Sequence, residues 1–257
     1  MNPVKKSNIS ILLTLVFILA SFSFGSAFAA DWEKKAKSYF EDDYYDECIK
    51  VVRDLKDDNF ARMFLAFSHL QLNKFNNTKS DQMAFKNAMI VLKDKTGSSD
   101  LDNLLYFVNQ KDKPHVIKEA RKLLGAAFKN CTQNEDVKKL VPLIRSSDEK
   151  TQDMTIKTVK KIIDPKRKMV NQGGTLREKD VAMMTDPDLI KALFESILTS
   201  PAASQTLLLI EKPVLKYISA YEGKKVMELE SKITKEIAKR EKKYPESNWY
   251  SATGKTR

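Results

Sequence analysis

The stretch IKEARKLLGAAFKNC, residues 117–131, shows the pattern on which the predicted fold depends. Its apolar and small residues recur at intervals of three and four, at Ile117, Ala120, Leu124, Ala127 and Cys131. Because an α-helix has 3.6 residues per turn, residues at these intervals lie on one face. The stretch is therefore predicted to form an amphipathic helix that buries this face against other elements.

The same spacing recurs along the chain between short polar breaks. Two of these breaks are Thr96–Asp100 and Asp164–Thr175, and the second contains two glycines. Proline stands at 114, 187 and 201, where a helix can begin because the missing N–H has no partner in a first turn. No segment shows the alternation of a β-strand. The chain is therefore predicted to be all-α, with further helix faces marked by Tyr45, Cys48, Ile49, Val52 and Leu55, and by Leu189, Ile190, Leu193, Phe194 and Ile197.

The composition agrees with a folded helical protein. Only 7 of the 257 residues are glycine, which disfavours a turn-rich β-sandwich or barrel. A hydrophobic content of 42% is enough for a packed core, so disorder is not expected. The 45 lysines and arginines exceed the 34 acidic residues, and the net charge of +11 predicts an attraction to polyanions.

Residues 1–29 have the layout of a secretory signal peptide. Lys5 and Lys6 precede the uncharged apolar run Ile9–Phe24, and the motif AFA at residues 27–29 follows. The run is shorter than the roughly 20 residues of a spanning helix, so we expect cleavage, with an uncleaved anchor as the alternative. No later segment is apolar enough to span a membrane. We therefore expect a periplasmic or secreted mature chain that does not meet nucleic acid.

Export leaves two interpretations of Cys48 and Cys131. Outside the cytosol the two thiols could form a disulfide. Each also stands at an apolar helical position, where free cysteine behaves as a small buried hydrophobic residue. We expect buried packing, with a mutual disulfide as the alternative.

The N-terminal part of the mature chain resembles the tetratricopeptide repeat family. Trp32, Ala36, Tyr39, Tyr45 and Cys48 stand at the spacing of its aromatic and small consensus positions. The resemblance covers about residues 31–93, and its second unit is weaker. There an arginine and a histidine replace the consensus Trp and Tyr, and the stretch 75–85 is too long.

A second segment, EDVKKLVPLIRSSDEKTQDMTIKTVKKIID at residues 135–164, resembles a HEAT-type unit with Pro142 in its first helix and Asp148 in its turn. Both families imply antiparallel helix pairs stacked into a right-handed α-solenoid. An irregular helical bundle is the alternative. The expected parts are a signal peptide at 1–29, tetratricopeptide-like repeats at 30–96, HEAT-like repeats at 97–222, a long C-terminal helix at 223–244 and a flexible tail at 245–257.

The repeat resemblance implies a groove that binds a protein or peptide partner. In the tetratricopeptide family the first helix of each pair lines the groove. Its positions correspond here to Lys37, Phe40, Met63, Phe67 and Leu70. The alternative is that the following helices cover these side chains.

The basic residues suggest a second type of site. Most lysines are interleaved with acids, as on a solvated helix face. The least compensated cluster is Lys166, Arg167, Lys168 and Arg177, against Asp164 alone. These residues are the candidates for binding an anionic envelope component.

The sequence contains no phosphate-binding glycine loop, no G-x-S-x-G motif and no H-E-x-x-H motif. No catalytic residue, metal site or cofactor is therefore predicted. The favoured function is an exported scaffold that binds a protein or peptide partner in a bacterial-type cell envelope. The alternatives are an envelope hydrolase whose active site has no recognisable motif, and a polyanion-binding envelope protein.

Overall fold

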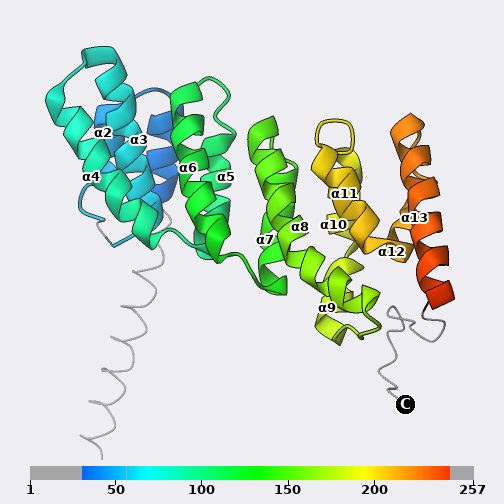
Figure 1. Cartoon of the computed structure of the whole chain (residues 1–257). Coiled ribbons are helices and arrows are strands. Elements are labelled where there is room, and N and C mark those ends of the chain that lie inside the picture. The colour runs from blue at the N-terminus through cyan, green and yellow to red at the C-terminus, as the bar shows by residue number, and fades with distance from the viewer. Residues whose placement is uncertain (1–30, 56, 244–257) are drawn as a thin grey trace, which may run out of the picture. The chain divides into compact units, whose positions relative to one another are not determined.

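The computed structural model describes residues 31–55 and 57–243, and every regular element in these ranges is a helix (Figure 1). The predicted all-α class is confirmed. The expected signal peptide and flexible tail lie outside the described residues. The chain divides into two compact units, and the boundary between them in the sequence falls between Leu92 and Lys93.

Unit 1 consists of a first helix at residues 31–41, followed by α2 (Tyr45–Val52), α3 (Asn59–Asn76) and α4 (Lys79–Lys95), whose end lies in unit 2. Its centre is aromatic. The Phe40 ring lies 5.6 Å from the rings of both Tyr45 and Phe64, in edge-to-face contact. Because such pairs gain energy beyond area burial, they hold the first helix, α2 and α3 together.

Unit 2 contains the remaining helices. They are a short 3-10 turn (Ser98–Asp100), α5 (Leu101–Val108), α6 (Pro114–Asn130), α7 (Asn134–Ile144), α8 (Glu149–Asn171), α9 (Glu178–Met184), α10 (Pro187–Glu195), α11 (Pro201–Ile210), α12 (Lys212–Ile218) and α13 (Lys224–Lys243). Pro114, Pro187 and Pro201 begin their helices, as predicted.

Helices that follow one another in unit 2 pack together, α5 with α6, α7 with α8, α10 with α11 and α12 with α13. α8 also packs against both α6 and α11 (Figure 1). It therefore connects the helices before it with those after it. The predicted C-terminal helix is present, and its stripe Val226, Leu229, Ile233 and Ile237 is buried.

The prediction that a break between helices begins at Asp164 is wrong, because α8 continues through Pro165 to Asn171. A proline inside a helix removes a hydrogen bond and costs about 3 kcal/mol. Here Arg167 and Val170 are buried beyond the proline, so tertiary packing of this last part offsets the local penalty. The chain turns only after the helix, at Gly173, whose φ is +85°.

The two cysteines are free and buried, which confirms the packing interpretation. The Cys48 thiol donates to the Ala36 carbonyl at 3.6 Å, and the Cys131 thiol donates to the Ala127 carbonyl at 3.5 Å. Burial raises the pKa of both thiols to about 11, so both stay protonated at neutral pH.

A buried carboxylate joins three parts of unit 2. Glu211, fully buried between α11 and α12, accepts from Arg167 of α8 and, at 3.0 Å, from Arg240 of α13. Its backbone has φ +61° and ψ −118°, a region that costs a residue with a side chain about 1–3 kcal/mol. The two arginines hold Glu211 in this conformation and attach α13 to the rest of the unit.

We expect Glu211→Gln to lower the free energy of unfolding by about 3–5 kcal/mol, because two buried guanidinium groups lose their shared negative charge. Urea denaturation followed by circular dichroism measures the change. The matched control is Glu241→Gln, which breaks the solvent-exposed pair with Lys212 and should have a much smaller effect. Equal losses in the two variants would show that Glu211 is not a structural anchor.

Candidate functional site

The prediction of a partner-binding groove on unit 1 is wrong for three of its five residues. Phe40, Met63 and Phe67 are completely buried, so no partner can reach them. They fill the space between packed helices, which is the alternative that the sequence left open. Lys37 and Leu70 are half-buried, and Lys37 forms an ion pair with Glu33 at 2.6 Å. These five residues do not form an accessible surface.

The prediction that the basic residues at 166–177 lack acidic partners is also wrong. Lys166 and Arg177 both approach Asp180, at 3.7 Å and 2.8 Å. Lys168 is exposed but lies 2.9 Å from Asp164. The fourth residue, Arg167, is buried against Glu211. Folding brings in two acids that the local sequence did not reveal as partners.

An open groove of about 710 Å³ lies instead between α6 and α8 in unit 2. The helices contribute basic and acidic side chains, a methionine and a glycine, and none of the lining residues is aromatic. The lining residues are Lys118, Arg121, Lys122 and Gly125 from α6, Glu149, Lys150, Asp153 and Met154 from α8, and Thr199.

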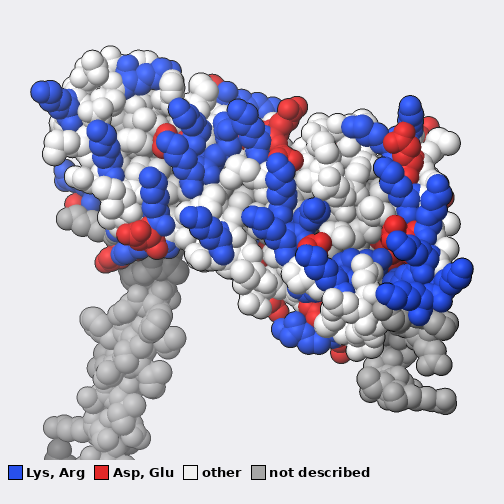
Figure 2. Space-filling model, viewed as in Figure 1, with Lys and Arg blue, Asp and Glu red and all other residues white. Residues whose placement is uncertain are grey.

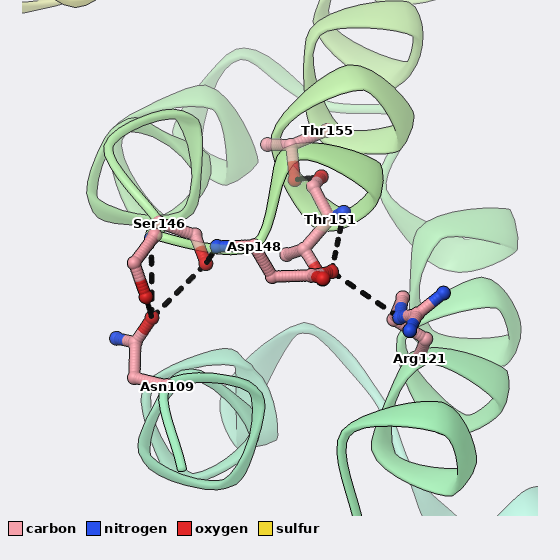
Figure 3. Close-up of polar contacts among 7 residues, drawn as sticks. Asn109, Arg121, Ser146, Asp148, Thr151 and Thr155 are labelled. Atoms are coloured by element: carbon pink, nitrogen blue, oxygen red, sulfur yellow. Dashed lines mark hydrogen bonds and ion pairs between the residues drawn. The ribbon is translucent and has the colours of Figure 1, made fainter. Parts of the chain in front are cut away.

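The turn between α7 and α8 sets the start of this groove (Figure 3). Asn109, just after α5, accepts from the Ser146 hydroxyl at 3.0 Å and from the Ser147 backbone N–H at 3.4 Å. The Ser146 hydroxyl in turn accepts from the Asp148 N–H at 3.2 Å. A side chain from one helix pair therefore fixes the turn of the next.

Asp148 connects this turn to the groove. Its carboxylate caps α8 by accepting from the Thr151 N–H at 2.9 Å and from the Thr151 hydroxyl at 2.7 Å. The same carboxylate lies 3.2 Å from Nε of Arg121 on α6. A terminal nitrogen of Arg121 points away from Asp148, and Arg121 lines the groove (Figure 3). Asp148 thus forms an ion pair with this guanidinium on the side that faces the turn.

Exposed lysines form a row on each of the two helices. Lys118, Lys122 and Lys129 share one face of α6, and on α8 the residues are Lys150, Lys157 and Lys161. In each row the first and last lysines are 11 residues apart, which corresponds to about 16 Å along a helix. In the space-filling view Lys and Arg side chains lie over α6 and α8, and others lie over α13 (Figure 2).

Local acids neutralise only the middle lysine of each row. Lys122 pairs with Glu119 and Lys157 with Asp153, both at 2.6 Å. The four outer lysines form no ion pair with any residue in the described ranges, namely Lys118, Lys129, Lys150 and Lys161. Four ammonium groups therefore keep their charge available for an external anion.

Two carboxylates also line the groove, one helical turn apart. The Lys157 hydrogen bond lowers the pKa of Asp153, and Ser200 donates to the same carboxylate at 2.8 Å. This is the opposite of the raised pKa that a general acid needs near neutral pH. Glu149 is exposed in the first turn of α8, where an acid is favoured by the helix dipole. Asp153 and Glu149 therefore have the features of acidic residues that stabilise the fold.

Sequence reasoning missed the α6–α8 site although its signal was present. The intervals of 4 and 7 between Lys118, Lys122 and Lys129 place them on one helix face. The sequence does not show which other helix lies beside this face, because only packing places the α8 row beside the α6 row.

No group of three or more metal-binding side chains occurs among residues 31–55 and 57–243.

We expect Asp148→Ala to destabilise the protein by about 1–2 kcal/mol, because α8 loses its cap. Asp148→Asn should cost less, since its amide oxygen can still accept from Thr151. Urea denaturation of both variants measures this difference. An equal cost would show that the charge facing Arg121, rather than the cap, is what matters.

Asp180 predicts a specific pH dependence. Burial alone would raise its pKa, but hydrogen bonds from Arg177 and Asn134 and the charge of Lys166 lower the pKa below its usual value. Its stabilisation is therefore complete above the unfolded pKa of about 3.9 and is lost as the pH falls through the lower folded pKa. At pH 7 the urea concentration at the midpoint of unfolding should be higher for the wild type than for Asp180→Asn. This gap between the two midpoints should become smaller below pH 4. A gap that is unchanged at pH 2 would contradict this.

No helix in the described ranges is long and apolar enough to cross a membrane. Comparison with protein-family models, curated proteins and solved structures finds no match to this chain. The tetratricopeptide and HEAT resemblances therefore rest on the residues quoted above, and the function has to be argued from the site.

Proposed function

We propose that the chain is an exported, non-catalytic scaffold of the bacterial-type cell envelope, built as an α-solenoid of stacked helix pairs. Its function is to bind a partner through a negatively charged segment along the groove between α6 and α8. The observation that carries this proposal is the pair of lysine rows beside the groove, in which the four outer lysines lack an ion-pair partner in the described chain.

Charge favours an anionic partner. Each outer lysine keeps a solvated positive charge, and like charges lined up on neighbouring helices reinforce one another's potential. Arg121 adds donors in a planar group that suits carboxylate or phosphate oxygens. The rows extend about 16 Å, so an elongated anion can contact several lysines at once.

Shape favours a segment that enters the groove rather than a flat surface. A membrane would touch the tips of the lysine side chains and leave a hollow of about 710 Å³ between α6 and α8 empty. A narrow polymer or peptide can fill it. The proposal accordingly keeps the interpretation of the chain as a binding protein but moves the site from unit 1 to unit 2.

The test is binding of a fluorescein-labelled oligoglutamate, measured by fluorescence anisotropy at two salt concentrations. We expect Lys118→Glu combined with Lys150→Glu to weaken binding about tenfold or more, which corresponds to about 1.4 kcal/mol. Added salt should weaken the wild type as well, because exposed charges are screened.

The matched control reverses two exposed lysines elsewhere in unit 2, Lys168→Glu with Lys191→Glu. It changes the net charge by the same amount and should leave most of the affinity. If both double variants lose affinity equally, the probe responds to net charge and the groove is not the site. If the wild type does not bind the probe, the proposed function is wrong.

A further inference from the structure

We infer that the occupant of the α6–α8 groove is an acidic peptide segment that seats an apolar side chain against Gly125 and Met154. This inference rests on the proposed function and specifies its partner. It follows from a feature of the groove that charge does not explain, which is the absence of a side chain at one position of α6 in the groove wall.

Gly125 lies inside α6, where glycine is less favourable than alanine. The helical backbone at this position does not require glycine. A Cβ added there would meet only the terminal methyl of Met154, at an ordinary contact distance of 3.8 Å. Packing inside the protein would therefore accept a methyl group at this position, and the glycine leaves that space open beside Met154.

Met154 faces this space from α8 and is half-buried. A methionine side chain is flexible and polarisable, so it adapts to the shape of an apolar group. Together Gly125 and Met154 form an apolar recess flanked by Lys118 and Lys122 on one helix and Lys150 on the other. The recess and its charged flanks match a segment in which one apolar residue stands among carboxylates.

The alternatives use only part of this surface. A polyphosphate carries charge but has no apolar group for the recess. A single-stranded nucleic acid gains much of its affinity by stacking bases on aromatic side chains, and no residue lining the groove is aromatic. An extended peptide advances about 3.3 Å per residue, so about five residues span the length of the lysine rows.

The experiment compares two labelled seven-residue peptides. Both consist of glutamates and differ at the central position, which is leucine in one and glycine in the other. We expect the wild type to bind the leucine peptide about tenfold more tightly, because one leucine side chain is buried on binding. Inorganic polyphosphate and anionic phospholipid vesicles serve as competitors and should displace the leucine peptide poorly.

Gly125→Leu should fill the recess and remove the preference for the leucine peptide, so that the two peptides bind with equal affinity. Gly125→Ala is the matched control, because its methyl group fits beside Met154 and should preserve most of the preference. Both substitutions favour the helix, and circular dichroism confirms that each variant is folded.

Failure of the inference is distinguishable from failure of the proposed function. Equal affinity for the two peptides, a preference that survives in Gly125→Leu, or stronger binding of polyphosphate or vesicles would overturn the inference, while the proposed anionic partner would stand. If neither peptide binds, the proposed function is wrong and the inference fails with it.

Discussion

The structure of unit 2 depends on amphipathic helices that can bury only one face each. In α6 the buried residues include Leu123, Leu124 and Ala127, and the lysine row lies on the opposite face. In α8 the buried stripe through Ile156, Val159 and Ile163 is likewise opposite its lysines. Because each helix needs a neighbour for its apolar face, α6 and α8 are brought together with their charged faces outward. The groove and its charge are consequences of this one requirement.

The second constraint is that a buried charge needs a partner. Asp180 and Glu211 are among the most buried polar residues, and each receives basic side chains from the 166–177 region. These ion pairs involve a buried Arg167 and a largely buried Lys166, whereas the side chain of Arg177 stays exposed. The outer lysines of the α6 and α8 rows stay exposed and form no ion pair in the described ranges. Ion pairing, and not the density of basic residues in the sequence, thus distinguishes the 166–177 region from the outer lysines of α6 and α8.

Order in the groove comes from the turn before α8. Asn109, Ser146 and Asp148 link α5, the α7–α8 turn and α6 through short polar contacts. Such contacts position Arg121 and the first turn of α8, so the groove walls meet in a defined register. A binding site on packed helices needs this support, because the position of each lysine depends on the helix that carries it.

Local sequence was enough to predict the all-helical class, the helix starts at Pro114, Pro187 and Pro201 and the buried stripe of the C-terminal helix, and it favoured buried packing of the cysteines over a disulfide. These features follow from local spacing, proline positions and side-chain type. Three features became evident only from the packed helices: α8 continues through Pro165, Phe40, Met63 and Phe67 are core residues, and Arg167 faces Glu211. The physical reason is distance along the chain. Helical periodicity shows which face of a helix is apolar, whereas the partners of that face and of its charges come from segments tens of residues away.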